Sequence, residues 1–430
     1  MGSLTTVKSS RLIRALPFYY GWVILAAGTL GIIMMGPSQT FTIGVFLDYL
    51  IADLGVSRAN ISLLYGLATL GASLLLPVTG RLTDRYGARR MVVVVVIGLG
   101  LASFWMSWAP GVAAIFAGLL ALRFFGFGSL QLVSNNVIAQ WFIRRRGFVM
   151  GLSGLSLPIG LLIFPVLSQA LINRFEWRGA WVALGLLVWV VMLPVGGLLF
   201  KDRPEQYGLT PDGDAPPPAA RPGTAAPPAE TNWTLAEARH TGAFWIFAVA
   251  LSTMTMILAG LVFHQISLFE VRGLSRETAV AAYNITALFS AISNIGMGRL
   301  LDRHSARLLL SLVMLLLAAT MTLVLVMHSP WQAFLYAALQ GLVSGCFRVM
   351  DATVWPKYYG RLHLGSIKGA TMLGVIGATS LGPYPLGLSM DYFGSYAPVL
   401  GGLLVLPLAI SVLALFVNRP EKQAGAALAL

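Results

Sequence analysis

Two oppositely charged residues, Arg348 and Asp351, lie inside a long apolar segment at residues 331–357. Their spacing of three places both side chains on one face of a helix. A guanidinium stays charged at physiological pH and binds a carboxylate through two parallel hydrogen bonds. Arg348 is therefore a candidate for binding an anionic ligand, and Asp351 for neutralising Arg348 or accepting a proton. A permanent structural ion pair is the alternative.

The elements that must position these residues are apolar segments long enough to cross a bilayer, which takes about 20 residues as a helix. Of the 430 residues, 57% are hydrophobic and 10% are charged. We expect an all-α membrane protein with twelve transmembrane helices, because lipid offers backbone groups no hydrogen-bond partner. The predicted spans are 20–47, 59–80, 91–108, 111–141, 147–172, 179–200, 242–268, 277–298, 308–327, 331–357, 365–390 and 397–417.

The chain repeats itself at half its length. The segment GRLTDRYGARR at residues 80–90 returns as GRLLDRHSAR at residues 298–307, and the same register aligns Tyr65 with Tyr283. A charged turn repeated between apolar segments predicts two pseudo-symmetric six-helix bundles. Internal repeats of this kind are typical of secondary transporters, whose substrate site lies near mid-membrane between the halves.

The two charged turns are candidates for a cytoplasmic gate. Asp84 and Asp302 can accept hydrogen bonds from helix N-termini or from arginines of the opposite half. Their predicted partners are Arg85, Arg89, Arg303 and Arg307. Such a network closes the cytoplasmic mouth and breaks when the mouth opens. The alternative is that these charges only set the topology.

One long polar stretch separates six spans from six. We expect an N-terminal bundle at residues 1–200, a cytoplasmic linker at 201–241 and a C-terminal bundle at 242–430. The linker centre, GDAPPPAARPGTAAPPAE, is too rich in Pro and Ala to bury a core and predicts a flexible tether. Thr234 and Glu237 near its end have the spacing of a capping box, which predicts a short amphipathic helix on the cytoplasmic membrane face.

Further polar residues interrupt the predicted spans. A charge at the bilayer centre costs about 2.5–3.5 kcal/mol, so Arg123 and His264 each need a reason. The imidazole of His264, with an ordinary pKa of about 6.5, suits proton uptake or a hydrogen-bonded gate. Aligning Trp141-Phe142 with Tyr358-Tyr359 places Gln131 opposite Arg348 about the pseudo-twofold axis. The neutral pocket candidates are Gln131, Asn135, Tyr283, Asn294 and Tyr384. Hydrogen bonding between helices is the alternative for each.

The net charge of +13 is distributed asymmetrically, with most of the 29 Lys and Arg residues on one predicted side. This positive-inside pattern predicts a multi-pass protein of the cell (inner or plasma) membrane with both termini in the cytoplasm. It argues against a nucleic-acid-binding surface. The single cysteine, Cys346, excludes an internal disulfide. Because no metal cluster, P-loop or nucleophile elbow is apparent, we expect no cofactor and no enzymatic activity.

The charged turn resembles the signature of the major facilitator superfamily, G-x-L-x-D-R-x-G-x-R-R. The matching residues are Gly80, Leu82, Asp84, Arg85, Gly87, Arg89 and Arg90, and in the second copy Gly298, Leu300, Asp302, Arg303 and Arg307. The resemblance implies two six-helix halves around a central cavity and transport by alternating access. Arg123 begins a pattern similar to one in the fourth span of the family, where such an arginine is linked to coupling and packing.

Finer motifs resemble the monocarboxylate and oxalate/formate branch of this superfamily. They are Tyr20-Gly21-Trp22, Trp141-Phe142 with Arg144-Arg145-Arg146-Gly147, Trp233-Thr234-Leu235 with Phe244-Trp245, and Asp391 to Tyr396. The branch implies small carboxylate substrates, often moved with a proton. The eighth span lacks the arginine that members with known carboxylate chemistry commonly carry there, and the eleventh span lacks the lysine that oxalate exchangers use. These departures argue against oxalate.

We therefore expect a proton-coupled transporter, acting by alternating access, of a small organic anion such as lactate or pyruvate. Its expected partners are the anion, a proton and membrane lipid, and we expect a monomer. Arg348 is the predicted carboxylate contact, while Asp351, His264 and Arg123 are the candidates for proton coupling. Alternatives are an efflux pump for amphipathic drugs or another small metabolite, and a transport-incompetent membrane receptor or scaffold.

Overall fold

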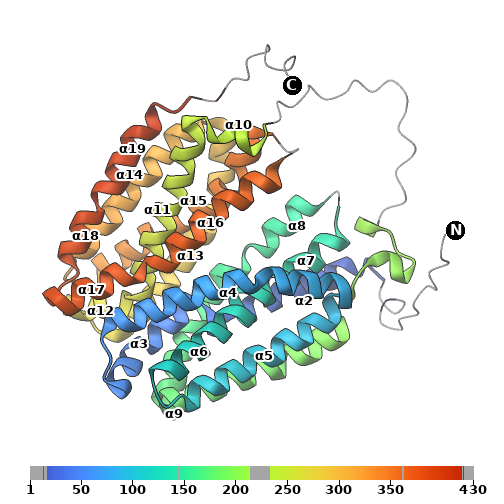
Figure 1. Cartoon of the computed structure of the whole chain (residues 1–430), viewed down its shortest axis with the longest axis horizontal. Helices are drawn as coiled ribbons and strands as arrows, with labels where there is room; N and C mark the ends of the chain where they lie inside the picture. Colours follow the sequence, from blue (N-terminus) through green and yellow to red (C-terminus); the bar gives the residue numbers. More distant parts are fainter. Residues whose placement is uncertain are drawn as a thin grey trace. The chain divides into compact units, whose positions relative to one another are not determined.

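The computed structural model describes residues 13, 17–143, 145–213, 233–360, 363–418 and 420, and the side chains of all but Arg146, Gly147, Asp302 and Gly365. Its described residues form helices and turns without a β-strand. By internal contacts the chain divides into two compact units (Figure 1). The first comprises Met1–Val56 and Leu67–Gly223, and the second Ser57–Gly66 and Thr224–Leu430. Arg144 and most of the Pro/Ala-rich linker lie outside the described residues.

The first unit contains α-helices and short 3-10 and π-helical segments. They are α2 (Gly21–Met34), η1 (Gly36–Ser38), α3 (Thr40–Leu54), α4 (Arg58–Tyr86, whose first residues belong to the second unit), α5 (Ala88–Trp108), α6 (Val112–Leu122), η2 (Arg123–Leu130), α7 (Gln131–Trp141), α8 (Arg146–Ser153), α9 (Ser156–Pro194), η3 (Val195–Leu199), η4 (Pro204–Tyr207) and η5 (Pro211–Gly213). Helix α5 packs along α9, and α2 packs along α7.

The second unit is built in the same way. Its helices are α10 (Leu235–Arg239), α11 (Gly242–Phe263), α12 (Gln265–Val271), α13 (Arg276–Arg303), α14 (Ala306–Val326), α15 (Pro330–Tyr359), α16 (Leu364–Leu381), α17 (Pro383–Phe393), α18 (Ala397–Leu403) and α19 (Val405–Leu415). The closest pairings are α13 with α15, α11 with α16 and α14 with α19. Figure 1 shows α14 and α19 side by side in this unit.

Ten stretches of the described residues are long and apolar enough to cross a membrane. One of them, Phe148–Leu199, contains Glu176 at φ 59° and ψ 171°, a non-helical conformation that divides it into two helices. Helices α16 and α17 together supply another span. Counted in this way, the described residues supply twelve candidate spans, in agreement with the predicted all-α membrane fold.

Two spans are broken, and one predicted cap is present. The first span breaks at η1, where Gly36 and Pro37 interrupt the helix. The eleventh span breaks between Leu381 and Pro383. Helix α10 begins with the predicted capping box, because Thr234 N donates to Glu237 Oε2 at 2.7 Å and Glu237 N donates to Thr234 Oγ1 at 3.2 Å.

Candidate functional site

Helix α15 lies directly on α13 because two glycines on one face of α15 leave room for the neighbouring backbone. A Cβ added at Gly341 would collide with the Thr286 carbonyl oxygen, and one at Gly345 with the Ser290 carbonyl oxygen. Glycines four residues apart are a common device for close helix packing in membranes. This spacing was visible in the sequence, and it is what brings the α15 charges close to α13.

Arg348 lies one turn beyond Gly345 and turns its guanidinium toward α13. Its Nη2 donates to Ser290 Oγ at 2.7 Å, whereas its Nε is buried without a hydrogen-bond partner. A guanidinium has five N–H donors, so most of its hydrogen-bonding capacity is unused. Among the described residues, no carboxylate lies within ion-pair distance of Arg348.

Asp351 has a different partner from the one expected. Its Oδ2 lies 3.2 Å from Nζ of Lys368 on α16, and its Oδ1 accepts from Trp355 Nε1 at 3.4 Å. The expectation that Asp351 neutralises Arg348 is therefore wrong for this structure. The reason is geometric: residues three apart on a helix share a face only approximately, and here one contacts α13 while the other contacts α16.

Lys368 is a residue that the sequence reasoning missed. It lies within the predicted span 365–390 but was given no role there, and α16, which begins at Leu364, places Lys368 in its second turn. The side chains of Lys368 and Asp351 are 39% and 32% exposed, so neither charge is fully buried. The signal available in the sequence was the intramembrane acid, Asp351, which needs a basic partner in a neighbouring span.

The other pocket candidates of the second unit divide into two groups. Asn294 lies four residues after Ser290 on the same face of α13, and Tyr384 opens α17. Both are half-buried and make no hydrogen bond with the described residues. Tyr283 is fully buried, and its hydroxyl donates to the Val262 carbonyl at 2.8 Å. Tyr283 therefore packs between helices, while Asn294 keeps its amide available.

Gln131 and Asn135 belong to the first unit, where they lie one turn apart on α7. Both are half-buried, and neither forms a hydrogen bond with the described residues. This face of α7 therefore presents two amides that can bind a polar solute. Their placement opposite Arg348 stays a prediction.

Arg123 is a buried contact of the first span. It is 1% exposed, its Nη1 donates to the Ser38 carbonyl at 2.9 Å, and its guanidinium lies 3.9 Å from the Phe127 ring centroid. It begins a π-helix, a form often found at functional sites. These contacts favour a role in holding the break at η1, because the guanidinium satisfies a carbonyl that the break releases.

His264 lies at the junction of α11 and α12 and is fully buried. Its Nε2 is 2.9 Å from the Pro383 carbonyl oxygen and 3.3 Å from Ser62 Oγ. Since a carbonyl only accepts, Nε2 carries a proton. The ring also packs against Tyr396. His264 thus ties the break of the eleventh span to the seventh, which favours the hydrogen-bonded gate over a solvent-exposed proton acceptor.

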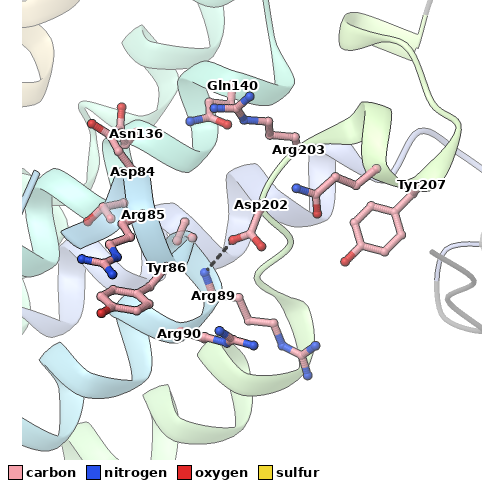
Figure 2. Close-up of a pocket in the computed structure, with 14 residues that line it drawn as sticks. Asp84, Arg85, Tyr86, Arg89, Arg90, Asn136, Gln140, Asp202, Arg203 and Tyr207 are labelled. Carbon is pink, nitrogen blue, oxygen red and sulfur yellow. Dashed lines mark hydrogen bonds between the residues drawn. The ribbon is translucent and has the colours of Figure 1, made fainter. Parts of the chain in front are cut away.

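The first charged turn surrounds a cavity of about 610 Å³ within the first unit. Figure 2 shows Asp84, Arg85 and Tyr86 on one side of it, Tyr207 on the other and Asp202 between them. Asp202 Oδ1 accepts from the backbone N of Arg89 at 3.0 Å and so caps α5. Arg89 Nε donates to the Gly197 carbonyl at 2.8 Å. Burial lowers the pKa of neighbouring Lys201, and the charge of Arg89 lowers it further.

The second charged turn has a smaller cavity of about 330 Å³ in the corresponding place. Arg307 Nη1 donates to Asn418 Oδ1 at 2.9 Å, just after the last helix, and Arg303 is exposed. The side chain of Asp302 lies outside the described residues. Arg89 in the first unit and Arg307 in the second are thus each hydrogen-bonded to the end of their own bundle. Pairing between the halves stays a prediction.

The aromatic motifs that resemble the monocarboxylate branch form clusters with a structural role. In the first unit, Tyr19 Oη donates to the Trp141 carbonyl at 2.7 Å, and Trp141 Nε1 donates to the Lys201 carbonyl at 3.0 Å. In the second, Trp233 N donates to the Tyr359 carbonyl at 2.9 Å. These clusters fix the chain on either side of the linker.

The described residues offer no group of three or more His, Cys, Asp and Glu side chains that could hold a metal ion. What the second unit does offer is a half-buried cation, Arg348, with nearby amide and hydroxyl groups. This arrangement suits a small anionic solute rather than covalent chemistry.

Comparison with known proteins defines the class. The model of the Major Facilitator Superfamily matches residues 28–302 and 283–429, so the chain belongs to this superfamily. A solved bacterial homologue of the human lysosomal transporter Spinster, inward-facing and occupied, has the same fold. Its TM-score is 0.70 at 15% identity, covering 94% of this chain and 99% of that one. The chain is therefore a multi-pass membrane protein of this superfamily.

Relatives with curated names are more similar in sequence but match over shorter stretches of the chain. The uncharacterized MFS-type transporter YhjX of Escherichia coli K12 is 26% identical over 264 residues, 61% of this chain and 60% of its own length. Monocarboxylate transporter 11 of Homo sapiens is 27% identical over 203 residues, 47% of this chain and 41% of its own. A quinolone resistance transporter of Acinetobacter baumannii is 30% identical over 154 residues, 33% of this chain and 34% of its own. Each match thus spans less than two thirds of the relative.

Proposed function

We propose that the protein transports a small organic anion, most simply a monocarboxylate such as lactate or pyruvate, together with a proton by alternating access. The observation that carries this proposal is the unpaired guanidinium of Arg348. It lies in a membrane span with a buried Nε that has no hydrogen-bond partner, and in the described part of the chain it forms no ion pair with a carboxylate.

The energetics favour an anionic ligand at this guanidinium. A charge at the bilayer centre costs about 2.5–3.5 kcal/mol. A carboxylate offsets that cost by pairing with the free edge of the guanidinium through two hydrogen bonds. Asn294 lies one turn from Ser290 on α13, and its side-chain amide makes no hydrogen bond with the described residues. In this proposal it binds the remaining polar atoms of the substrate.

The charges of the second unit also support proton coupling. Arg348, Asp351 and Lys368 together carry one excess positive charge, which one monocarboxylate neutralises. A proton taken up by Asp351 breaks its 3.2 Å contact with Lys368 and releases α16 from α15. Such a pair is a two-state element that substrate and proton can both bias. His264 and Arg123 hold breaks in the spans and act in this proposal as positioning residues.

The name of the human relative supports the carboxylate class, and the drug-resistance relative keeps efflux of amphipathic drugs as the second candidate. The charge distribution supports an inner or plasma membrane location with both termini in the cytoplasm. The fold supports transport by a single chain.

The test is uptake of labelled lactate by proteoliposomes under an imposed inward proton gradient. We expect uptake by the natural protein to exceed that of empty vesicles and to fall at least tenfold in Arg348→Ala. Arg348→Lys retains the charge but not the bidentate geometry, and should be intermediate. The matched control is Arg299→Ala, an exposed arginine of α13. Wild-type uptake by Arg348→Ala, with normal reconstitution, would remove Arg348 from the site.

A further inference from the structure

A groove of about 580 Å³ runs along the second unit between α11 and α16, away from the Arg348 site. Its lining includes Trp245 and Val249 of α11, Ala370 and Gly374 of α16, and Leu406 of α19. No residue of α15 lines it. The groove is therefore separate from the contacts proposed for the transported anion.

The groove exists because α16 carries small residues where α11 carries large ones. A Cβ added at Gly374 would lie 3.2 Å from Ser252 Oγ, so the α16 backbone itself forms part of the floor. Trp245, Val249 and Leu406 are 55%, 49% and 39% exposed. In helices that cross a membrane, such side chains are surrounded by lipid rather than water. Hydrocarbon is thus the natural filling of this groove.

One end of the groove is basic. Arg239, the last residue of α10, is exposed and makes no side-chain hydrogen bond or ion pair with the described residues. Its position is fixed, because its carbonyl accepts from Trp245 Nε1 at 2.8 Å. The nearby acid, Glu237, is committed to capping α10. A tryptophan beside an arginine at a helix end is typical of the membrane interface.

We propose that this groove binds one anionic phospholipid. The phosphate group is held by Arg239, and one acyl chain lies along Val249, Gly374 and Leu406. Charge complementarity selects a headgroup with net negative charge, because Arg239 forms no ion pair with the residues that the structure describes. The volume lies in the range of about 300–1,000 Å³ that is usual for bound small ligands. This binding is independent of which solute the protein transports.

The structural consequence concerns the packing of α11 against α16. An acyl chain in the groove contacts both helices and fills space that no side chain fills. A ligand that binds only the folded state stabilises it by RT ln(1 + L/Kd), where L is the free ligand concentration, so the gain rises with the logarithm of the ligand concentration once this exceeds the dissociation constant. The bound lipid should therefore raise the unfolding temperature of the whole protein.

The test is native mass spectrometry of the full-length, detergent-solubilised protein with added dioleoyl phosphatidylglycerol, dioleoyl phosphatidylcholine or oleate. We expect one phosphatidylglycerol adduct, with phosphatidylcholine and oleate retained at least fivefold less. Arg239→Ala should lower phosphatidylglycerol occupancy at least fivefold. Ala370→Trp fills the groove and should also lower phosphatidylglycerol occupancy at least fivefold. If Ala370→Trp does not fold, Val249→Trp on α11 is the second groove-filling variant, with the same expected result.

The control is Arg299→Ala, which removes an exposed arginine of α13 that does not line the groove. It should leave occupancy unchanged. Unchanged phosphatidylglycerol occupancy in both Arg239→Ala and a folded groove-filling variant would overturn the proposal. Equal retention of phosphatidylcholine by the natural protein would contradict the assigned role of Arg239, and preferential retention of oleate would assign the groove to fatty acids instead.

Discussion

The Asp351 carboxylate lies 3.2 Å from the Lys368 ammonium, so the acid of α15 is tied to α16. Arg348, one turn earlier on the same helix, donates instead to Ser290 of α13. The two charges therefore hold α15 against two different helices. One of them, Arg348, keeps hydrogen-bonding capacity for a ligand, and the other is engaged in a contact that protonation can break.

The Asp351–Lys368 pair is expected to matter more for coupling than for stability. Because both side chains are about one third exposed, we expect a coupling energy of about 1 kcal/mol or less in a double-mutant cycle of Asp351→Asn and Lys368→Gln. In the same variants, uptake of labelled substrate should lose its dependence on the proton gradient. A normal gradient dependence in Asp351→Asn would assign proton coupling to another group.

Gly345 is expected to be intolerant of any side chain. Gly345→Leu places atoms against the Ser290 carbonyl and must move α15 off α13. Overpacking of this kind costs about 1–3 kcal/mol, which predicts a lower unfolding temperature and a loss of substrate binding through displaced Arg348. Gly369→Ala is the matched control, because nothing lies within 4 Å of its added Cβ. Equal unfolding temperatures for the two variants would argue against the glycine contact.

The cap of α5 can be tested at Asp202. Asp202→Ala removes the acceptor of the Arg89 backbone N and should cost about 0.5–2 kcal/mol, measured by thermal unfolding. Gly87→Ala should destabilise as well, because Gly87 has φ 84° and its added Cβ would meet the Asp202 carboxylate. Gly80→Ala, with open space around its Cβ, serves as the reference. Wild-type stability of Asp202→Ala would show that the cap does not contribute.

Lys201 should give stability a pH dependence. Burial lowers its folded-state pKa below the ordinary 10.5, so over the window just below pH 10.5 the unfolded chain binds more protons than the folded one. Stability due to this group therefore rises with pH in that window. Lys201→Met should unfold at a higher temperature than the natural protein at pH 7, and the gap should narrow as the pH approaches 10.5. A gap that widens with pH would contradict the sign.

The sequence predicted the fold well because its signals are local. Apolar length defined the spans, and the repeated turn defined the two halves. The spacing of Thr234 and Glu237 sufficed for the cap of α10, since a capping box involves four consecutive residues.

The candidate site was predicted only in part because its contacts join different helices. Arg348 and Asp351 were correctly placed on one helix, but spacing within α15 does not say which neighbour each side chain meets. Lys368 was missed although the predicted span 365–390 contains it, because the sequence does not say that its side chain meets Asp351 of α15. Tyr283 and Arg123 proved to satisfy carbonyls released by neighbouring helices, which composition alone does not reveal.

The central claim, that Arg348 binds the carboxylate of the transported solute, is tested most directly by equilibrium binding of labelled lactate to the purified protein. The account predicts saturable binding that lactamide, the neutral isostere, competes for at least tenfold more weakly. It also predicts loss of binding in Arg348→Ala with partial recovery in Arg348→Lys. Unchanged lactate affinity in Arg348→Ala, or equal competition by lactamide, would contradict it.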